Sequence, residues 1–467
     1  MLNKRYQSLY QSIFWTVMGI TFAILTYLLS KIGFKESISK TILFFSSCIL
    51  VHYSVIKQKK YEIPVSFAVL GILLFLIGDF FYDLAQSYLH IPLWDFMCFY
   101  LFGNVGISGL NFYDPHAFMQ VFNNLNLHSI VGDGLTHEVV NVGFWYPPPS
   151  MFLFLPLGIF SLKTGYIIWQ TVIILFLLLD ILLIIKWFPY NLNSAYNKKT
   201  TGFLLAILIL LFPSITGSIL ISQTPSIFLF FLILILKYSD NWKSGIYLVL
   251  LIIIKPLAIF FLLYFLFYKN WKVLISCLIT GCLIIGVSSL CFGFNSFIIF
   301  LKSPPTNRIP FEIFYESTEQ SLFAVLLRLQ HRFYGSINFQ NIKILTYILS
   351  VPFILISFYS SKLLSKKNPL LAFMIFIILA LLLYPNTLVS YIIILIPIMI
   401  YLLNQNPFKN NFVNWIILFF LYTVGHYSFF LLNIVLWLGF IIWSLPYKYN
   451  LIERQWIRHA AGSIIEK

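Results

Sequence analysis

The sequence predicts an all-α polytopic membrane protein, because its composition and its long apolar runs agree. Of the 467 residues, 60% are hydrophobic and only 10% are charged, whereas an average soluble domain carries about 25% charged residues. A helix needs roughly 20 apolar residues to span a bilayer, and apolar runs such as 171–185, 201–220 and 246–267 recur along the chain. These runs are continuously apolar rather than alternating, which excludes a membrane β-barrel.

About fourteen apolar segments can be drawn, and we expect about 12–14 transmembrane helices. The segments are 12–30, 41–56, 63–80, 147–162, 165–185, 201–220, 225–237, 245–268, 273–293, 342–360, 369–384, 388–403, 411–425 and 428–445. Segments 147–162 and 225–237 are short, and either one could be tilted or re-enter the membrane.

The same drawing predicts how the chain is organised. Residues 1–62 form extra N-terminal spans, residues 63–445 form one membrane domain, and residues 446–467 form a cytoplasmic tail. The membrane domain includes two long loops, 81–149 and 294–340.

Basic residues favour the cytoplasmic side of a membrane and set the expected topology. Lysines in 57–60 and 361–367 then lie inside, whereas Lys186, Lys198 and Lys199 fall outside, against the rule. Loops 81–149 and 294–340 and the turn 384–387 emerge together on the non-cytoplasmic face. Three segments that are distant in sequence could therefore build one site.

The formal net charge of +15 does not predict nucleic-acid binding, because the basic residues sit singly or in short clusters at helix ends. The five cysteines show no paired spacing, and the histidines show no metal-ligand spacing. No phosphate-binding glycine loop or dinucleotide fingerprint is present. We therefore expect no cofactor and no metal.

Asp95 is the first candidate for chemistry. It lies between Trp94 and Phe96 in loop 81–149, which we expect to lack secondary structure of its own; loops of that length are usually functional. Apolar walls disfavour the charged carboxylate and raise its pKa towards that of a general base. A solvated loop carboxylate or a helix N-cap is the alternative, and Asp79 and Asp83 compete for the role.

Two further stretches offer positive charge. Gln320, Arg328 and Arg332 are spaced by multiples of four, so on a helix they would lie close to one face. Guanidinium groups suit phosphate recognition, although an amphipathic helix in the membrane interface would show the same pattern. Lys255 lies within an apolar run, where a charge costs roughly 2.5–3.5 kcal/mol and indicates function by default; snorkelling or pairing inside the bundle is the alternative.

Several motifs resemble glycosyltransferase family 87, whose members are polyprenyl-phosphate-dependent mannosyltransferases. The stretches that resemble its first external loop are Asp95-Phe96 with Tyr100, Gly109 to Pro115, and Tyr146-Pro147-Pro148. Further similar elements are Ser222-Gln223-Thr224 (its Gly-Gln-x-Asn turn), Lys255-Pro256 (its Lys-Pro pair), and Glu319-Gln320-Ser321-Leu322 with Arg328 (its Asn-Gln-Ser-Leu…Arg element). The chain departs from the family in having Glu319 where Asn is commoner and Ser390 where a His is expected.

The resemblance implies a GT-C-type helical bundle in the cell membrane, with an active site on the non-cytoplasmic face. It implies inverting transfer of a hexose, with mannose the expected sugar, from a polyprenyl-phosphate donor to a lipid or glycan acceptor. Asp95 would be the catalytic base. The residues implied in substrate binding are Tyr100, Tyr113, Asp114, Tyr146, Lys255, Glu319, Gln320, Arg328 and Arg332. A transporter or flippase of a lipid-linked sugar, and a glycan ligase or polymerase using a polyprenyl-diphosphate donor, are the alternatives.

Overall fold

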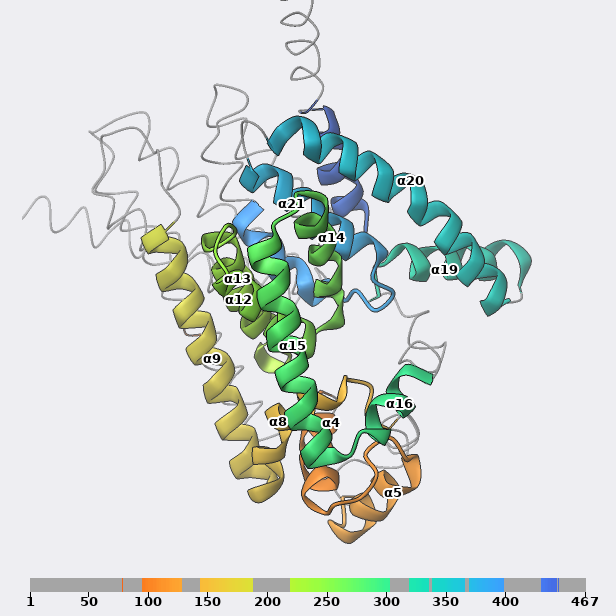
Figure 1. Cartoon of the computed structure of the whole chain (residues 1–467). Helices are drawn as coiled ribbons and strands as arrows, with labels where there is room; N and C mark the ends of the chain where they lie inside the picture. The colour runs from red at the N-terminus through yellow and green to blue at the C-terminus, as the bar shows by residue number, and fades with distance from the viewer. Residues whose placement is uncertain are drawn as a thin grey trace, which may run out of the picture. The chain divides into compact units, whose positions relative to one another are not determined.

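The computed structural model describes residues 78, 95–127, 143–187, 219–302, 319–335, 338–365, 369–398, 430–442 and 444 (Figure 1). The chain divides into two compact units, which are considered separately. Unit 1 comprises Met1–Asn141, Phe152–Ile233 and Ile396–Thr423, and unit 2 comprises Val142–Met151, Leu234–Leu395 and Val424–Lys467. The N-terminal spans expected before residue 62 and the tail after residue 446 lie outside the described residues.

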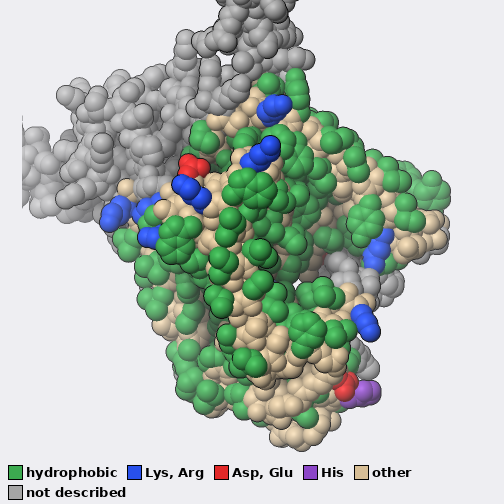
Figure 2. Space-filling model, in the orientation of Figure 1, with side chains coloured by type: hydrophobic (Ala, Val, Ile, Leu, Met, Phe, Trp, Pro, Cys, Tyr) green, Lys and Arg blue, Asp and Glu red, His purple; other side chains and the backbone are tan. Residues whose placement is uncertain are grey.

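The described elements are helical, and three are long and apolar enough to cross a membrane. They are α9 (Leu162–Trp187), α15 (Trp271–Phe292) and α20 (Phe339–Ser365). Shorter apolar helices include α12 (Pro225–Lys237), α21 (Pro369–Leu383) and Phe430–Ile442. Hydrophobic side chains cover most of the coloured surface in Figure 2, and Leu283 and Leu290 of α15 are among the most exposed. The chain is thus an all-α polytopic membrane protein, as its composition predicts.

In unit 1, the expected structureless loop is wrong over residues 95–124, where two helices form. These are α4 (Asp95–Ile107) and α5 (Pro115–Asn124). Residues 96–102 form an apolar, largely aromatic run that is buried, and its polar flanks hid it in the sequence. A Cβ atom on Gly103 of α4 would lie 2.3 Å from the Phe154 carbonyl oxygen, so only glycine permits this close approach of the two backbones.

Segment 147–162, drawn as a short span, is instead a series of helical turns. They are η1 (Pro148–Ser150), α8 (Met151–Phe154) and η2 (Leu155–Ile159). Prolines at 148, 149 and 156 lack the N–H group that a continuous α-helix requires, which explains the breaks.

Helices α9 and α12 run parallel in unit 1. The Ser226 hydroxyl donates to the Ile173 carbonyl oxygen at 3.3 Å, and the rings of Phe176 and Phe230 lie 5.1 Å apart. Contacts therefore advance along both helices in the same direction. Each of these parallel helices has a lysine in its last turn, Lys186 in α9 and Lys237 in α12.

In unit 2, the expected single span 245–268 is wrong, because the chain reverses within it. Helix α13 (Lys243–Ile254) ends at Lys255, whose backbone is extended (φ −148°), and η3 (Pro256–Ala258) leads into α14 (Ile259–Phe267). The loops that flank this segment meet, since the Asn270 amide donates to the Ser239 carbonyl oxygen at 2.9 Å. Residues 243–267 thus form a re-entrant hairpin with Lys255 and Pro256 at its tip.

The arms of the hairpin are too short to cross a bilayer. The 12 residues of α13 extend about 18 Å, against a hydrocarbon core of about 30 Å. Helix α13 packs closely on the start of α15, where a Cβ atom on Gly245 would lie 2.4 Å from the Val273 carbonyl oxygen.

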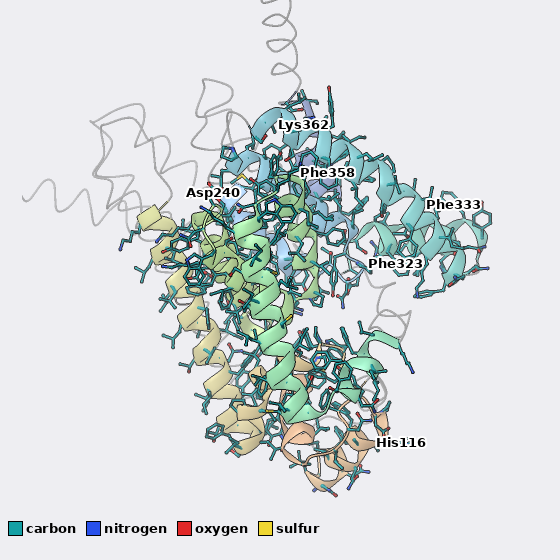
Figure 3. All side chains as sticks on the ribbon, in the orientation of Figure 1. His116, Asp240, Phe323, Phe333, Phe358 and Lys362 are labelled. Atoms are coloured by element: carbon teal, nitrogen blue, oxygen red, sulfur yellow. The ribbon has the colours of Figure 1, made fainter. Side chains whose placement is uncertain are left out.

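The end of α20 and the start of α21 lie at the open end of this hairpin. The hydroxyl groups of Tyr268 and Ser361 are 2.7 Å apart, and the Tyr264 hydroxyl donates to the Pro369 carbonyl oxygen at 3.4 Å. Asp240 and Lys362 mark this end in Figure 3. The lysines in and beside these turns are Lys237, Lys243, Lys269, Lys272 and Lys362.

The hairpin predicts that Asn241 and Lys269 are accessible from the same side of the membrane. Single cysteines at these exposed positions, in a chain without the native cysteines, should react with an impermeant thiol reagent from one side only. Lys362 and Asn338, near opposite ends of α20, provide the reference pair, because they should react from opposite sides. Labelling of Asn241 and Lys269 from opposite sides would restore the single span.

Candidate functional site

In unit 2, two non-helical segments that are distant in sequence pair with each other. Glu319 forms an antiparallel bridge with Leu388, and the Gln320 N–H donates to the Thr387 carbonyl oxygen at 2.7 Å. The Ser321 hydroxyl donates to the Pro385 carbonyl oxygen at 2.7 Å. Two of the three segments that could build one site, loop 294–340 and the turn 384–387, therefore contact each other; the shared site itself stays a prediction.

The helix that follows carries both candidate arginines but not Gln320. Helix α19 (Leu322–Tyr334) begins after Ser321, whose side chain caps it. Gln320 precedes the cap in the extended segment, and its side-chain oxygen accepts from the Phe430 N–H at 3.3 Å. The expectation that Gln320 shares a helix face with Arg328 and Arg332 is therefore wrong.

Arg328 and Arg332 have different surroundings. Arg328 Nη1 donates to the Glu319 carbonyl oxygen at 2.7 Å, so this side chain braces the extended segment. Arg332 is exposed in the last turn of α19. In Figure 3, Phe323 lies near the start of α19 and the exposed Phe333 near its far end. Arg328 is thus the arginine that the fold places beside the paired segments.

Lys255, at the tip of the hairpin, lies between two buried tyrosines. Its Nζ atom is 5.5 Å from the ring centroid of Tyr146 and 5.2 Å from that of Tyr391. Both rings are almost fully buried, and a cation over an aromatic face is stabilised by the ring quadrupole. The interruption between α13 and η3 therefore places the half-buried, positively charged Lys255 side chain among aromatic rings.

Tyr384 and Glu319 extend this group of side chains. Burial raises the pKa of the Tyr384 phenol, and the nearby Tyr146 and Glu319 raise it further. Tyr384 is consequently neutral near pH 7 and can donate a hydrogen bond. We call Lys255, Tyr146, Tyr391, Tyr384 and Glu319 the Lys255 cluster. Sequence reasoning missed Tyr384 and Tyr391, although both lie in the segment where the chain departs from the family pattern.

In unit 1, the Asp95 carboxylate contacts a side chain 128 residues further along the chain. Asp95 is the first residue of α4, and its Oδ2 atom accepts from Gln223 Nε2 at 3.0 Å. The position at a helix N-terminus favours a negative charge. A helix-terminal role and a catalytic role are therefore both compatible with Asp95. Gln223 was recognised in the sequence only as part of a turn.

The other candidates in unit 1 make structural contacts. The Tyr100 hydroxyl donates to the Phe160 carbonyl oxygen at 3.2 Å, and Asp114 caps α5 by accepting from the His116 N–H at 2.9 Å. Tyr113 is buried, with its ring 4.8 Å from that of Phe112. Their part in substrate binding stays a prediction. Asp79 and Asp83 lie outside the described residues.

Together, the helical fold and the polar breaks define a membrane protein that places charged side chains, such as Lys255 and the buried Glu319, at non-helical segments. The model of glycosyltransferase family 87 matches residues 144–390, more than half of the 467 residues. The chain belongs to glycosyltransferase family 87 and is a membrane glycosyltransferase. No curated protein and no solved structure shows significant similarity to it.

The matched region contains Lys255, Gln223 and Arg328, whereas Asp95 precedes it and Tyr391 of the Lys255 cluster directly follows it. The hydrogen bond from Gln223 to Asp95 therefore ties Asp95 to the matched region.

We expect Arg328→Ala to impair sugar transfer more than Arg328→Lys does, and both more than Arg332→Ala. The guanidinium group has several N–H donors in a fixed geometry, so it could donate to the Glu319 carbonyl oxygen and to a phosphate at the same time. A lysine ammonium group cannot reproduce this geometry. Because a hydrogen bond to a charged group contributes ~1.5–3 kcal/mol, the KM for a phosphate-bearing donor should rise by roughly tenfold or more. Steady-state kinetics and melting temperatures of the three variants check this. A larger effect at Arg332 would move the assignment to that residue.

Proposed function

We propose that this membrane glycosyltransferase transfers a hexose, with mannose the expected sugar, from a polyprenyl-phosphate donor to a lipid or glycan acceptor. The observation that carries the catalytic assignment is the Asp95 carboxylate held by Gln223 at 3.0 Å. The proposed fold is of the GT-C type, in which external segments supply the catalytic residues.

The proposed reaction is a single displacement that inverts the anomeric carbon. Asp95 takes the proton of the acceptor hydroxyl as its oxygen attacks that carbon, and a general base of this kind contributes about 10²–10⁴-fold to rate. The bond from the carbon to the phosphate oxygen breaks, and the phosphate leaves with the electron pair. A donor-binding cation would stabilise the developing anion, and Lys255 and Arg328 are the residues expected in that role.

The fold supports a revised topology for the proposal. If 147–162 and 245–268 do not cross, two of the fourteen expected crossings disappear and about twelve remain. Lys186, Lys198 and Lys199 then lie in the cytoplasm with Lys237, Lys243 and Lys269, so the exception to the positive-inside rule is removed. The proposed topology then has four segments on the non-cytoplasmic face of the cell membrane: 95–161, 221–224, 294–340 and 384–388. On that face a polyprenyl-linked donor can supply the sugar without a nucleotide sugar.

One observation favours a second candidate, a flippase of a lipid-linked sugar. Transporters use interrupted helices to line substrate sites within the bilayer, and the hairpin that carries Lys255 is such an interruption. The two candidates differ in product, because a flippase moves the donor lipid without breaking its glycosidic bond. A polymerase or ligase using a diphosphate donor differs in the leaving group.

The proposed function is tested by incubating purified protein with radiolabelled polyprenyl-phosphate mannose and a native lipid extract. We expect label to move to a new lipid or glycan product and polyprenyl phosphate to be released. Asp95→Asn keeps the size of the side chain but cannot accept the proton, so transfer should fall by about 10²–10⁴-fold. Asp240→Asn, at an exposed carboxylate to which no role in the site is assigned, serves as the matched control. Full transfer by Asp95→Asn together with loss in Asp114→Asn would transfer the catalytic role to Asp114.

Lys255→Met should raise the KM for the donor by roughly tenfold or more, because it keeps the apolar stem and removes only the charge. Lys243→Met, at the exposed start of the same helix, is the control and should behave like the parent enzyme. If Lys255 only fills the space between Tyr146 and Tyr391, the melting temperature would change while the donor KM stayed constant.

A further inference from the structure

We propose that Gln223 is a positioning residue that orients the Asp95 carboxylate and keeps it ionised for proton abstraction. The inference rests on the proposed function, since it assumes that Asp95 is the base. Gln223 Nε2 donates to Asp95 Oδ2 at 3.0 Å, and the Gln223 side chain is 7% exposed. The amide therefore approaches the carboxylate from a largely buried position.

The turn that carries Gln223 is held in a conformation that few side chains favour. Ser222 has a φ of +65°, in the left-handed region that is uncommon for residues other than glycine. Trp169 Nε1 donates to the Ser222 carbonyl oxygen at 2.9 Å, and Gln170 Nε2 donates to the Ser222 hydroxyl at 2.8 Å and to the Ile219 carbonyl oxygen at 2.7 Å. These bonds from α9 fix the direction in which the next residue, Gln223, leaves the backbone.

The same stretch of α9 also holds the start of α4. The Phe96 ring, next to Asp95, packs edge-on against Tyr166 with centroids 5.1 Å apart. The Tyr166 hydroxyl in turn lies 3.2 Å from Gln170 Nε2. Both partners of the Gln223–Asp95 bond are thus attached to residues 166–170 of one helix. Such a shared support is what a preorganised catalytic group requires.

The bond has a direct consequence for proton transfer. A hydrogen bond donated to a carboxylate stabilises its charged form and lowers its pKa, opposing the effect of apolar surroundings. Without the donor, the carboxylate stays protonated to higher pH and less of the enzyme is ready to act as a base. The acid limb of the pH–rate profile should therefore move to higher pH when Gln223 loses its amide.

Among the described residues, the titratable groups on the elements around Asp95 are few. Helix α4 contributes Cys98 and Tyr100, α9 contributes Tyr166, and α5, which packs on α4, begins at Asp114 and His116. The two lysines of α9, Lys163 and Lys186, are exposed near its ends, and the turn 219–224 contains no titratable side chain. Thiol and phenol groups ordinarily titrate above neutral pH, so among these described groups a limb on the acid side belongs to a carboxylate or an imidazole. A limb that moves when Gln223 loses its amide belongs to the carboxylate that Gln223 contacts.

The test is the pH dependence of kcat/KM with radiolabelled polyprenyl-phosphate mannose as donor. Gln223→Leu removes the donor at similar size, and Gln223→Glu replaces it with a second carboxylate. We expect both variants to lose tenfold or more at neutral pH and to shift the acid limb upward by about one to two pH units. Ser226→Ala, which loses a single hydrogen bond to α9, is the matched control and should leave the limb in place.

Two outcomes would overturn the inference. In the first, Gln223→Leu and Gln223→Glu keep the parental pH–rate profile. In the second, activity falls by the same factor at every pH and the melting temperature falls too, which indicates a structural role alone. Failure of the proposed function is separate, because the parent enzyme would then transfer no label from the donor. Normal transfer by Asp95→Asn would remove the catalytic assignment on which the inference rests. If Asp95→Asn is inactive while the Gln223 variants keep the parental limb, only the positioning role is lost.

Discussion

The fold depends on one constraint: wherever the backbone leaves helical geometry within an apolar bundle, its polar groups must find partners other than water. Three interruptions in the described residues meet this constraint differently. Side chains of α9 satisfy the turn at Ser222. Pro256 removes one donor at the tip of the hairpin. The segment at Glu319 pairs with the segment at Leu388 and is braced by Arg328.

These interruptions are also where the candidate functional side chains lie. Gln223 is in the first, Lys255 in the second and Glu319 in the third. A polar side chain is costly on a continuous apolar helix in the membrane. At an interruption, by contrast, backbone N–H and C=O groups already require hydrogen-bond partners. At the first and third interruptions, the hydrogen bonds that satisfy the backbone therefore also fix the segments that carry Gln223 and Glu319.

The errors of the sequence reasoning have a common physical cause. Hydropathy shows that residues 245–268 are apolar, but it does not show whether the chain reverses within them. A re-entrant hairpin and a single transmembrane span therefore give the same signal. Similarly, the polar flanks of residues 95–107 concealed a buried helix. The four-residue spacing of Gln320 and Arg328 suggested a shared helix face, but the Ser321 cap starts the helix after Gln320.

The sequence by itself determined the membrane class, the long apolar helices α9, α15 and α20, and the family, because these depend on apolar runs and on motifs that are local in the chain. Only the tertiary structure decided that the chain reverses at Lys255, that Lys255 lies between Tyr146 and Tyr391, and that Gln223 bonds Asp95. Each of these joins residues far apart in sequence. Their contact depends on how helices pack, through small residues such as Gly245 and supports such as Trp169, and no local pattern encodes that packing.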